Sequence, residues 1–132
     1  MRAQYQPKII LSVSRLTAGN GENSRNFLAL QSALKELGIS FITAWGVYQG
    51  VGEASVCLAH NERNYGIAKQ IARHYEQECI LLIDNEGQGH LDYTNGKPTE
   101  KIGAMVVSKD KPKGDHTYFY STREYLTFNG VA

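Results

Sequence analysis

The chain has 132 residues, 42% of them hydrophobic, which suits one domain that folds without metal or disulfide help. Its 14 basic and 13 acidic residues are interspersed, and the net charge of +1 gives no electrostatic case for nucleic acid. Residues 1–16 do not have the pattern of a signal peptide, and no run approaches the length of a membrane span. We therefore expect a single domain over residues 1–132 that is cytoplasmic, with neither nucleic acid nor a membrane as partner.

The cysteines and histidines give no indication of a metal centre or a disulfide framework. Cys57 and Cys79 both lie in apolar, strand-like runs, where small buried thiols are common. The four histidines are scattered at spacings that match no zinc-binding template. We predict no metal site and no cofactor.

The first part of the chain contains a strand pattern followed by a helix pattern. Residues 8–14, KIILSVS, are apolar at alternate positions, which predicts a strand. The glycine-containing loop that follows lacks the spacing of a phosphate-binding loop. Apolar residues then recur at helical spacing, which predicts a helix that begins at Asn23 or Ser24 and ends at Gly38.

The segment 40–58 predicts two strands joined by a flexible bend. Residues 39–48 alternate in side-chain character, and two glycines after them allow the chain to turn. Glu53 is the only carboxylate of this segment and stands where the second strand begins, close in sequence to Tyr48. These two side chains are the first candidates for a functional site.

The remaining patterns indicate a second helix, more strands and a final helical turn. In chain order, we predict a helix over 61–78, a buried strand over 79–84, a hairpin of strands 90–94 and 101–108 that turns at Asn95-Gly96, a strand over 118–120, and a short helix opened by a capping box at 121–124.

The order strand-helix-strand-strand-helix-strand predicts an α+β fold of the ferredoxin-like βαββαβ type. In this sandwich both helices cover one face of an antiparallel sheet, and we expect the C-terminal hairpin and short helix as additions to it. The other face stays bare and carries Ser12, Ser14 and either the Trp45 or the Tyr48 series of side chains. A bare face of this kind favours oligomerisation.

The run IAKQIARHYEQECILLIDNEGQGHLDY at 67–93 resembles the helix, strand and hairpin of phage-encoded enzymes that degrade S-adenosylmethionine. The VSR end of the first strand, the GEA step around Glu53 and the tail YFYSTREYL are similar to the same family. The resemblance covers most of the chain and is most specific at EQEC (76–79) and around Glu53.

The resemblance implies an S-adenosylmethionine lyase that gives 5′-methylthioadenosine and L-homoserine lactone and so counteracts methylation and restriction in the host cytoplasm. It also implies a fold similar to the PII proteins and a homotrimer whose sites lie between subunits. In the lyase reaction the substrate's own carboxylate attacks its Cγ and the sulfonium leaves as a thioether. This chemistry requires a near-attack conformer and a dry pocket, with no protein nucleophile and no metal.

The resemblance matches Glu53, in the GEA step, to the functional glutamate of the family, and Tyr48 is the second catalytic candidate because it lies close to Glu53 in the sequence. Glu53 would hold the substrate ammonium or steady the sulfonium side, and Tyr48 would donate a hydrogen bond or present its ring to the cation. Ser12, Ser14 and Arg15 are candidates for binding the ribose or the substrate carboxylate. Trp45 is a further substrate-binding candidate, as an adenine-stacking side chain, although a place in the core or at a subunit interface would also explain it.

Three alternatives remain open at this point. A hydrolase of the same family would use a water molecule activated by Glu53 and form homoserine directly. A PII-like sensor would bind an adenine nucleotide without turnover. A small phage protein could also act only by contacting a host protein.

Overall fold

The structure is a computed structural model that describes residues 6–15 and 17–130. Over these ranges the chain forms two helices and eight strands. The helices are α1 (Asn20–Glu36) and α2 (Glu62–His74). The strands are β1 (Lys8–Ser12), β2 (Phe41–Tyr48), β3 (Val51–Ala59), β4 (Cys79–Ile83), β5 (Gln88–Tyr93), β6 (Glu100–Ser108), β7 (His116–Phe119) and β8 (Glu124–Phe128).

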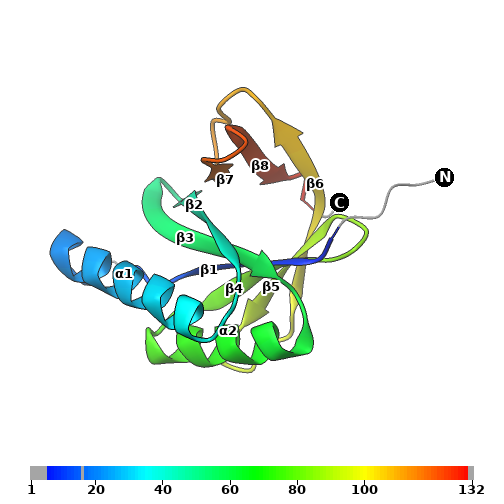
Figure 1. The fold of residues 1–132 in the computed structure, drawn as a ribbon. Helices are drawn as coiled ribbons and strands as arrows, with labels where there is room; N and C mark the ends of the chain where they lie inside the picture. Colours follow the sequence, from blue (N-terminus) through cyan, green and yellow to red (C-terminus); the bar gives the residue numbers. More distant parts are fainter. Residues whose placement is uncertain (1–5, 16, 131–132) are drawn as a thin grey trace.

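The strands form a closed antiparallel barrel in the order β1-β3-β2-β7-β8-β6-β5-β4. The prediction of a ferredoxin-like, PII-like sandwich is therefore wrong. The first six elements do follow the order βαββαβ, and β4, β1, β3 and β2 are neighbours. The sheet does not end there, because β5 pairs with β4 and β7 pairs with β2, and β6 and β8 join the two sides. Figure 1 shows β6, β7 and β8 rising above the part of the sheet that carries the helices.

The predicted C-terminal helix is also wrong, because residues 124–128 form β8. Its inward residues Leu126 and Phe128 alternate with Tyr125 and Thr127, which is the period of a strand. Arg123 has a φ of 58°, in the left-handed region, so a helix cannot run through it into the following residues. The capping-box residues instead make the turn between β7 and β8.

Both helices pack against the outer surface of β1, β3 and β4 (Figure 1). The apolar residues of this layer are fully buried; they include Ile9, Leu11, Leu34, Val56 and Ile80. A second, smaller cluster fills the barrel and contains Ile10, Cys57, Ile83 and Leu126. We call the side of the sheet that carries this second cluster the inner face. Because side chains alternate along each strand, β1, β3 and β4 contribute to both layers.

The two helices differ from their predicted bounds at their ends. α1 begins earlier than predicted, at Asn20, and Asn23 uses its side-chain oxygen to accept the Arg15 N–H over 3.0 Å. α2 has Asn61 as its N-cap, which accepts the Asn64 N–H over 2.8 Å, as capping residues do. It ends at His74 because Glu76 takes a φ of 58°, which no α-helix can continue through.

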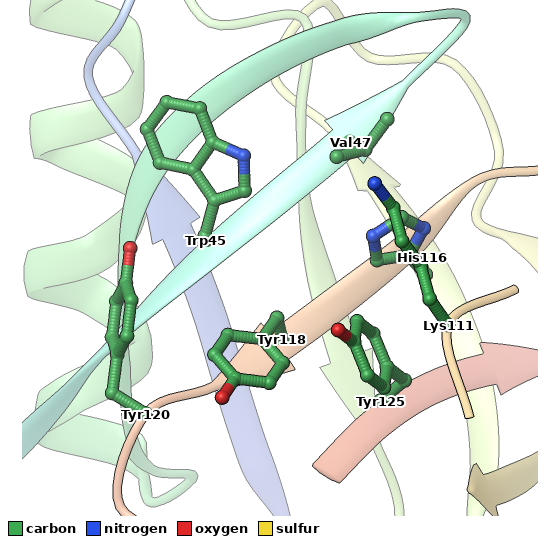
Figure 2. A pocket seen from close by; sticks show the side chains of 7 residues that line it. All are labelled: Trp45, Val47, Lys111, His116, Tyr118, Tyr120 and Tyr125. Carbon is green, nitrogen blue, oxygen red and sulfur yellow. The ribbon is translucent and has the colours of Figure 1, made fainter. Parts of the chain in front are cut away.

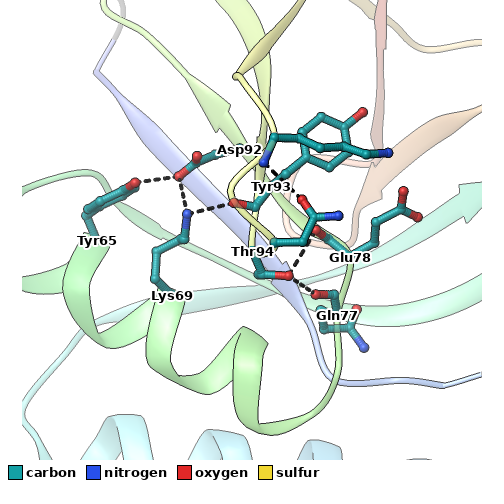
Figure 3. A network of polar contacts seen from close by, with 9 residues as sticks. Tyr65, Lys69, Gln77, Glu78, Asp92, Tyr93 and Thr94 are labelled. Atoms are coloured by element: carbon teal, nitrogen blue, oxygen red, sulfur yellow. Dashed lines mark hydrogen bonds and ion pairs between the residues drawn. The ribbon is translucent and has the colours of Figure 1, made fainter.

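A buried polar network fastens α2 to β5 (Figure 3). The Lys69 ammonium lies 3.1 Å from the Asp92 carboxylate, and each side chain is 10% exposed. Lys69 also donates to the Tyr93 carbonyl over 3.0 Å, and the Tyr65 hydroxyl donates to Asp92. These partners satisfy most of the hydrogen-bonding capacity of a charge pair that is nearly removed from water.

The predicted hairpin at Asn95-Gly96 is confirmed, with β5 ending at Tyr93 and β6 beginning at Glu100. Leu91 of β5 pairs with Glu100 of β6, so the chain between them forms the turn. The register shifts at Gly89, where an added Cβ would lie 2.4 Å from the Phe128 ring, so only glycine fits. None of the helices in the described ranges is long and apolar enough to cross a membrane.

Candidate functional site

Glu53 lies on the inner face of β3, directly opposite Gly46 of β2. Ser55 and Cys57 follow on the same face of β3, and Gly46 is in turn opposite Thr117 of β7. A Cβ placed on Gly46 would lie 3.6 Å from the Glu53 Cγ and 3.5 Å from the Ser55 Oγ. The missing side chain at Gly46 therefore leaves space beside the Glu53 carboxylate.

Burial raises the pKa of the Glu53 carboxyl, and hydrogen bonding with the Ser12 side chain partly lowers it again. Ser12 is 7% exposed and lies on β1, opposite Ser55. Its hydroxyl donates to the Ala54 carbonyl over 3.0 Å and accepts the Ser14 N–H over 3.1 Å. Ser12 therefore connects the end of β1 to the strand that carries Glu53.

Further carboxylates surround the same end of the barrel. The pKa of the Cys79 thiol is raised to about 11, mainly by burial and then by the negative charges of Glu78, Glu53, Glu100 and Asp92. Figure 3 shows Glu78 beside the start of β4 and Tyr93 at the end of β5. Glu53, Glu78 and Glu100 are thus acidic side chains near the start of β4 that would favour a small cationic ligand.

Tyr48 ends β2 and shares the inner face with Gly46 and Glu53. Its side chain is 56% exposed, and its pKa is raised, first by loss of solvent and then by the charges of Asp115 and Glu78. Tyr48 and Glu53 thus face the same space, as the sequence suggested.

Arg15 lies near this end of the barrel, but its charge is already paired. Its guanidinium is 3.1 Å from Glu22 at the start of α1 and 3.4 Å from Glu76 just after α2. The Gln77 side chain donates to the Ser14 carbonyl over 2.7 Å, which fixes the chain before Arg15. Arg15 therefore ties both helices to the end of β1, and Ser14 lies in the same junction.

Trp45 lies on the opposite side of the sheet from Glu53. It is paired with Ala54 and Tyr118, and side chains at odd positions of β2 point outward. A Cβ on Gly52 would lie 2.3 Å from the Trp45 ring, so the indole rests directly on that backbone. The strand pairing places Ser12, Tyr48 and Glu53 on the inner face and Trp45 on the outer face.

Trp45 belongs instead to an outer cavity of about 410 Å³ (Figure 2). The residues that line it are Trp45, Val47, Lys111, His116, Tyr118, Tyr120 and Tyr125. Sequence reasoning missed this cavity, although the aromatic alternation of HTYFY and EYLTF could have indicated a common face. The sequence also offered no reason to single out Glu100. Over the described ranges, no three His, Cys, Asp or Glu side chains gather as a metal site would need.

On the inner face of the barrel, the partly buried Glu53 carboxylate, the Ser12 hydroxyl and Tyr48 form the candidate small-molecule site. Residues 9–129 match the S-adenosylmethionine lyase family, so the chain belongs to that family. It is an enzyme, a lyase that acts on S-adenosylmethionine. Among curated proteins, none matches the chain.

Proposed function

We propose that the enzyme converts S-adenosylmethionine to 5′-methylthioadenosine and L-homoserine lactone at the inner end of the barrel. The substrate carboxylate forms a C–O bond to its own Cγ while the Cγ–S bond breaks. The bonding electrons go to sulfur, so the sulfonium becomes a neutral thioether, and no proton, water or oxidant is consumed. The observation that carries this proposal is the partly buried Glu53 carboxylate on the inner face of the barrel, in a chain of the lyase family.

Glu53 acts as a positioning group for a cationic substrate. Its carboxylate binds the substrate ammonium, which leaves the substrate carboxylate free to reach Cγ. The partly desolvated site favours the step, because the opposite charges of carboxylate and sulfonium are lost as the reaction proceeds. Tyr48 contributes its hydroxyl or ring face to the sulfonium side, and Ser12 orients the Glu53 carboxylate.

The other candidate residues take supporting places in this proposal. Ser14 and Arg15 hold the end of β1 in position, because Arg15 already has two carboxylate partners. Trp45 supports the site from behind through its contact with Gly52, which precedes Glu53 in β3.

We also propose that the active unit is a homotrimer that binds the substrate between its subunits. In a host cytoplasm, the enzyme would counteract methylation and restriction by degrading S-adenosylmethionine. Support comes from the bend between β2 and β3, where Tyr48 is 56% and Val51 42% exposed beside the Glu53 site. A neighbouring subunit that covers these side chains would exclude water from the substrate. Light scattering of the active enzyme tests this: a monomer with full activity would contradict it.

The products of a short incubation test the lyase mechanism. We expect homoserine lactone to accumulate before homoserine, because the carboxylate attacks intramolecularly. In ¹⁸O-labelled water, the first-formed lactone should carry no label. Homoserine formed directly, with ¹⁸O in its side-chain hydroxyl, would show that Glu53 activates water and that the enzyme is a hydrolase.

The acid side of the pH profile should report the Glu53 carboxyl. Because burial raises its pKa above the usual 4.5, kcat/KM should begin to fall at a higher pH than for an exposed glutamate. Ser12→Ala removes the neighbouring hydroxyl that lowers this pKa, so the acid limb should move further upward. The exposed Ser121→Ala should leave the limb in place. An unchanged limb in Ser12→Ala would contradict the assignment.

A further inference from the structure

The outer aromatic cavity lies away from the Glu53 site and has a composition of its own (Figure 2). Its volume of about 410 Å³ falls within the range of roughly 300–1,000 Å³ that small-molecule sites occupy. Trp45 and Tyr120, at one end, are 40% and 52% exposed. Large aromatic side chains so open to solvent, gathered around one hollow, suit a ligand with a flat ring.

The strand pairing fixes the aromatic side chains relative to one another. Trp45 of β2 pairs with Tyr118 of β7, which pairs with Tyr125 of β8, so the three stand in one row across the sheet. The Tyr118 ring lies 4.8 Å from that of Tyr125 and 5.4 Å from that of Tyr120, the latter edge to face. These contacts give a rigid wall on which a planar ring can stack at little entropic cost.

The other end of the cavity carries Lys111 and His116. The His116 Nδ1 lies 2.8 Å from the Gly114 carbonyl and must donate to it, which in the neutral ring leaves Nε2 as an acceptor for a ligand hydroxyl. Three tyrosine hydroxyls, the indole N–H and the lysine ammonium are donors, whereas no carboxylate lines the cavity. Asp115, the acidic residue next to His116, accepts the Gln49 N–H over 2.8 Å.

We propose that this cavity binds a nucleoside monophosphate, with the base against Trp45 and Tyr120 and the phosphate toward Lys111. The arrangement of rings at one end and a cation at the other matches a ligand that is flat at one end and anionic at the other. S-adenosylmethionine has the wrong charge for it, since its ammonium and sulfonium give it a net positive charge. This site lies outside the lyase reaction and does not depend on how that reaction proceeds.

The chain offers a direct probe, because Trp45 is its only tryptophan. Titration with AMP should change the tryptophan fluorescence, and calorimetry should give an affinity about tenfold higher than for adenosine or ribose 5-phosphate, which each lack one half of the ligand. Tyr120→Ala, which removes one stacking ring, should weaken AMP binding about fivefold or more.

Two lysines of one exposed loop provide a matched pair of variants. Lys111→Gln should weaken AMP about fivefold and leave adenosine unchanged, whereas Lys113→Gln, outside the cavity, should change neither. The proposal is overturned if AMP leaves the fluorescence unchanged, if adenosine binds as tightly as AMP, or if the two variants behave alike. If S-adenosylmethionine displaced AMP at a concentration similar to that of AMP, the cavity would be identified as the substrate site instead. Much tighter binding of an oligodeoxythymidylate would make it a nucleic-acid surface.

Discussion

Replacement of Glu53 by Gln is expected to abolish measurable turnover of S-adenosylmethionine, a loss of at least about 100-fold. The amide keeps the size of the side chain but cannot hold the substrate ammonium by charge, so the reactive conformer is no longer selected. Identification and quantification of 5′-methylthioadenosine under saturating substrate measures the effect. The exposed Glu86→Gln, in the turn after β4, is the matched control and should retain full activity.

The same variant should fold at least as stably as the parent. Burial raises the pKa of Glu53 in the folded state, so its contribution to stability is present below the unfolded pKa and is lost as the pH rises through the folded pKa. At pH 7 the ionised carboxylate therefore costs stability, and Gln removes that cost. The melting temperature of Glu53→Gln should equal or exceed that of the parent at pH 7, and the gap should close near pH 4. A large loss of stability would instead identify Glu53 as a structural residue.

Replacement of Lys69 by Met is expected to destabilise the fold by about 3–5 kcal/mol. The substitution keeps an unbranched side chain in the same space but leaves the Asp92 carboxylate buried without its cation. Tyr65 remains as a hydrogen-bond donor to Asp92, but a neutral hydroxyl cannot replace the ammonium charge. Equilibrium unfolding in urea measures the change.

A double variant separates the buried charge from the lost packing. Lys69→Met combined with Asp92→Leu removes both charges, so it should recover much of the stability that Lys69→Met loses. Arg63→Met is a control on the same helix, where an exposed side chain donates to the Leu37 carbonyl over 2.7 Å. If Lys69→Met lost no more stability than Arg63→Met, the network of Figure 3 would not be what fastens α2 to β5.

Local patterns were sufficient for most elements but not for the closure of the sheet. The alternation in β1 to β3 and the helical spacing in α1 and α2 are short-range signals, and they predicted the first six elements in order. Closure depends on pairing between β2 and β7, which lie far apart in the chain, and nothing local in HTYF specifies its partner. Residues 121–128 contain two local patterns, a capping box that favours a helix and the alternation of EYLTF that favours a strand. The strand forms because β6 and β7 both pair with this segment.

The sequence could predict the candidate residues that lie close together in the chain. It could not predict the residues that approach one another only in the folded protein. Tyr48 and Glu53 flank one bend, so their common face followed from the strand pair. Trp45 is just as near Glu53 in the sequence, but its side chain points outward. The face of β2 on which a side chain lies is set by strand pairing, such as that of Trp45 with Tyr118, and the local sequence does not specify this pairing. Glu78, just before β4, and Glu100, at the start of β6, both lie near Cys79, and no spacing in the sequence predicts this proximity.

Closure of the barrel has a consequence for how copies of this protein can associate. In an open sheet the first and last strands expose unpaired N–H and C=O groups, on which another chain can add a strand. Each of the eight strands described here has a partner on both sides, so no such edge is offered. Copies of the chain can then meet only through side chains, such as those around the bend after Tyr48. The same closure removes the template on which β-rich chains aggregate, so concentrated solutions should resist fibre formation as long as the barrel stays closed.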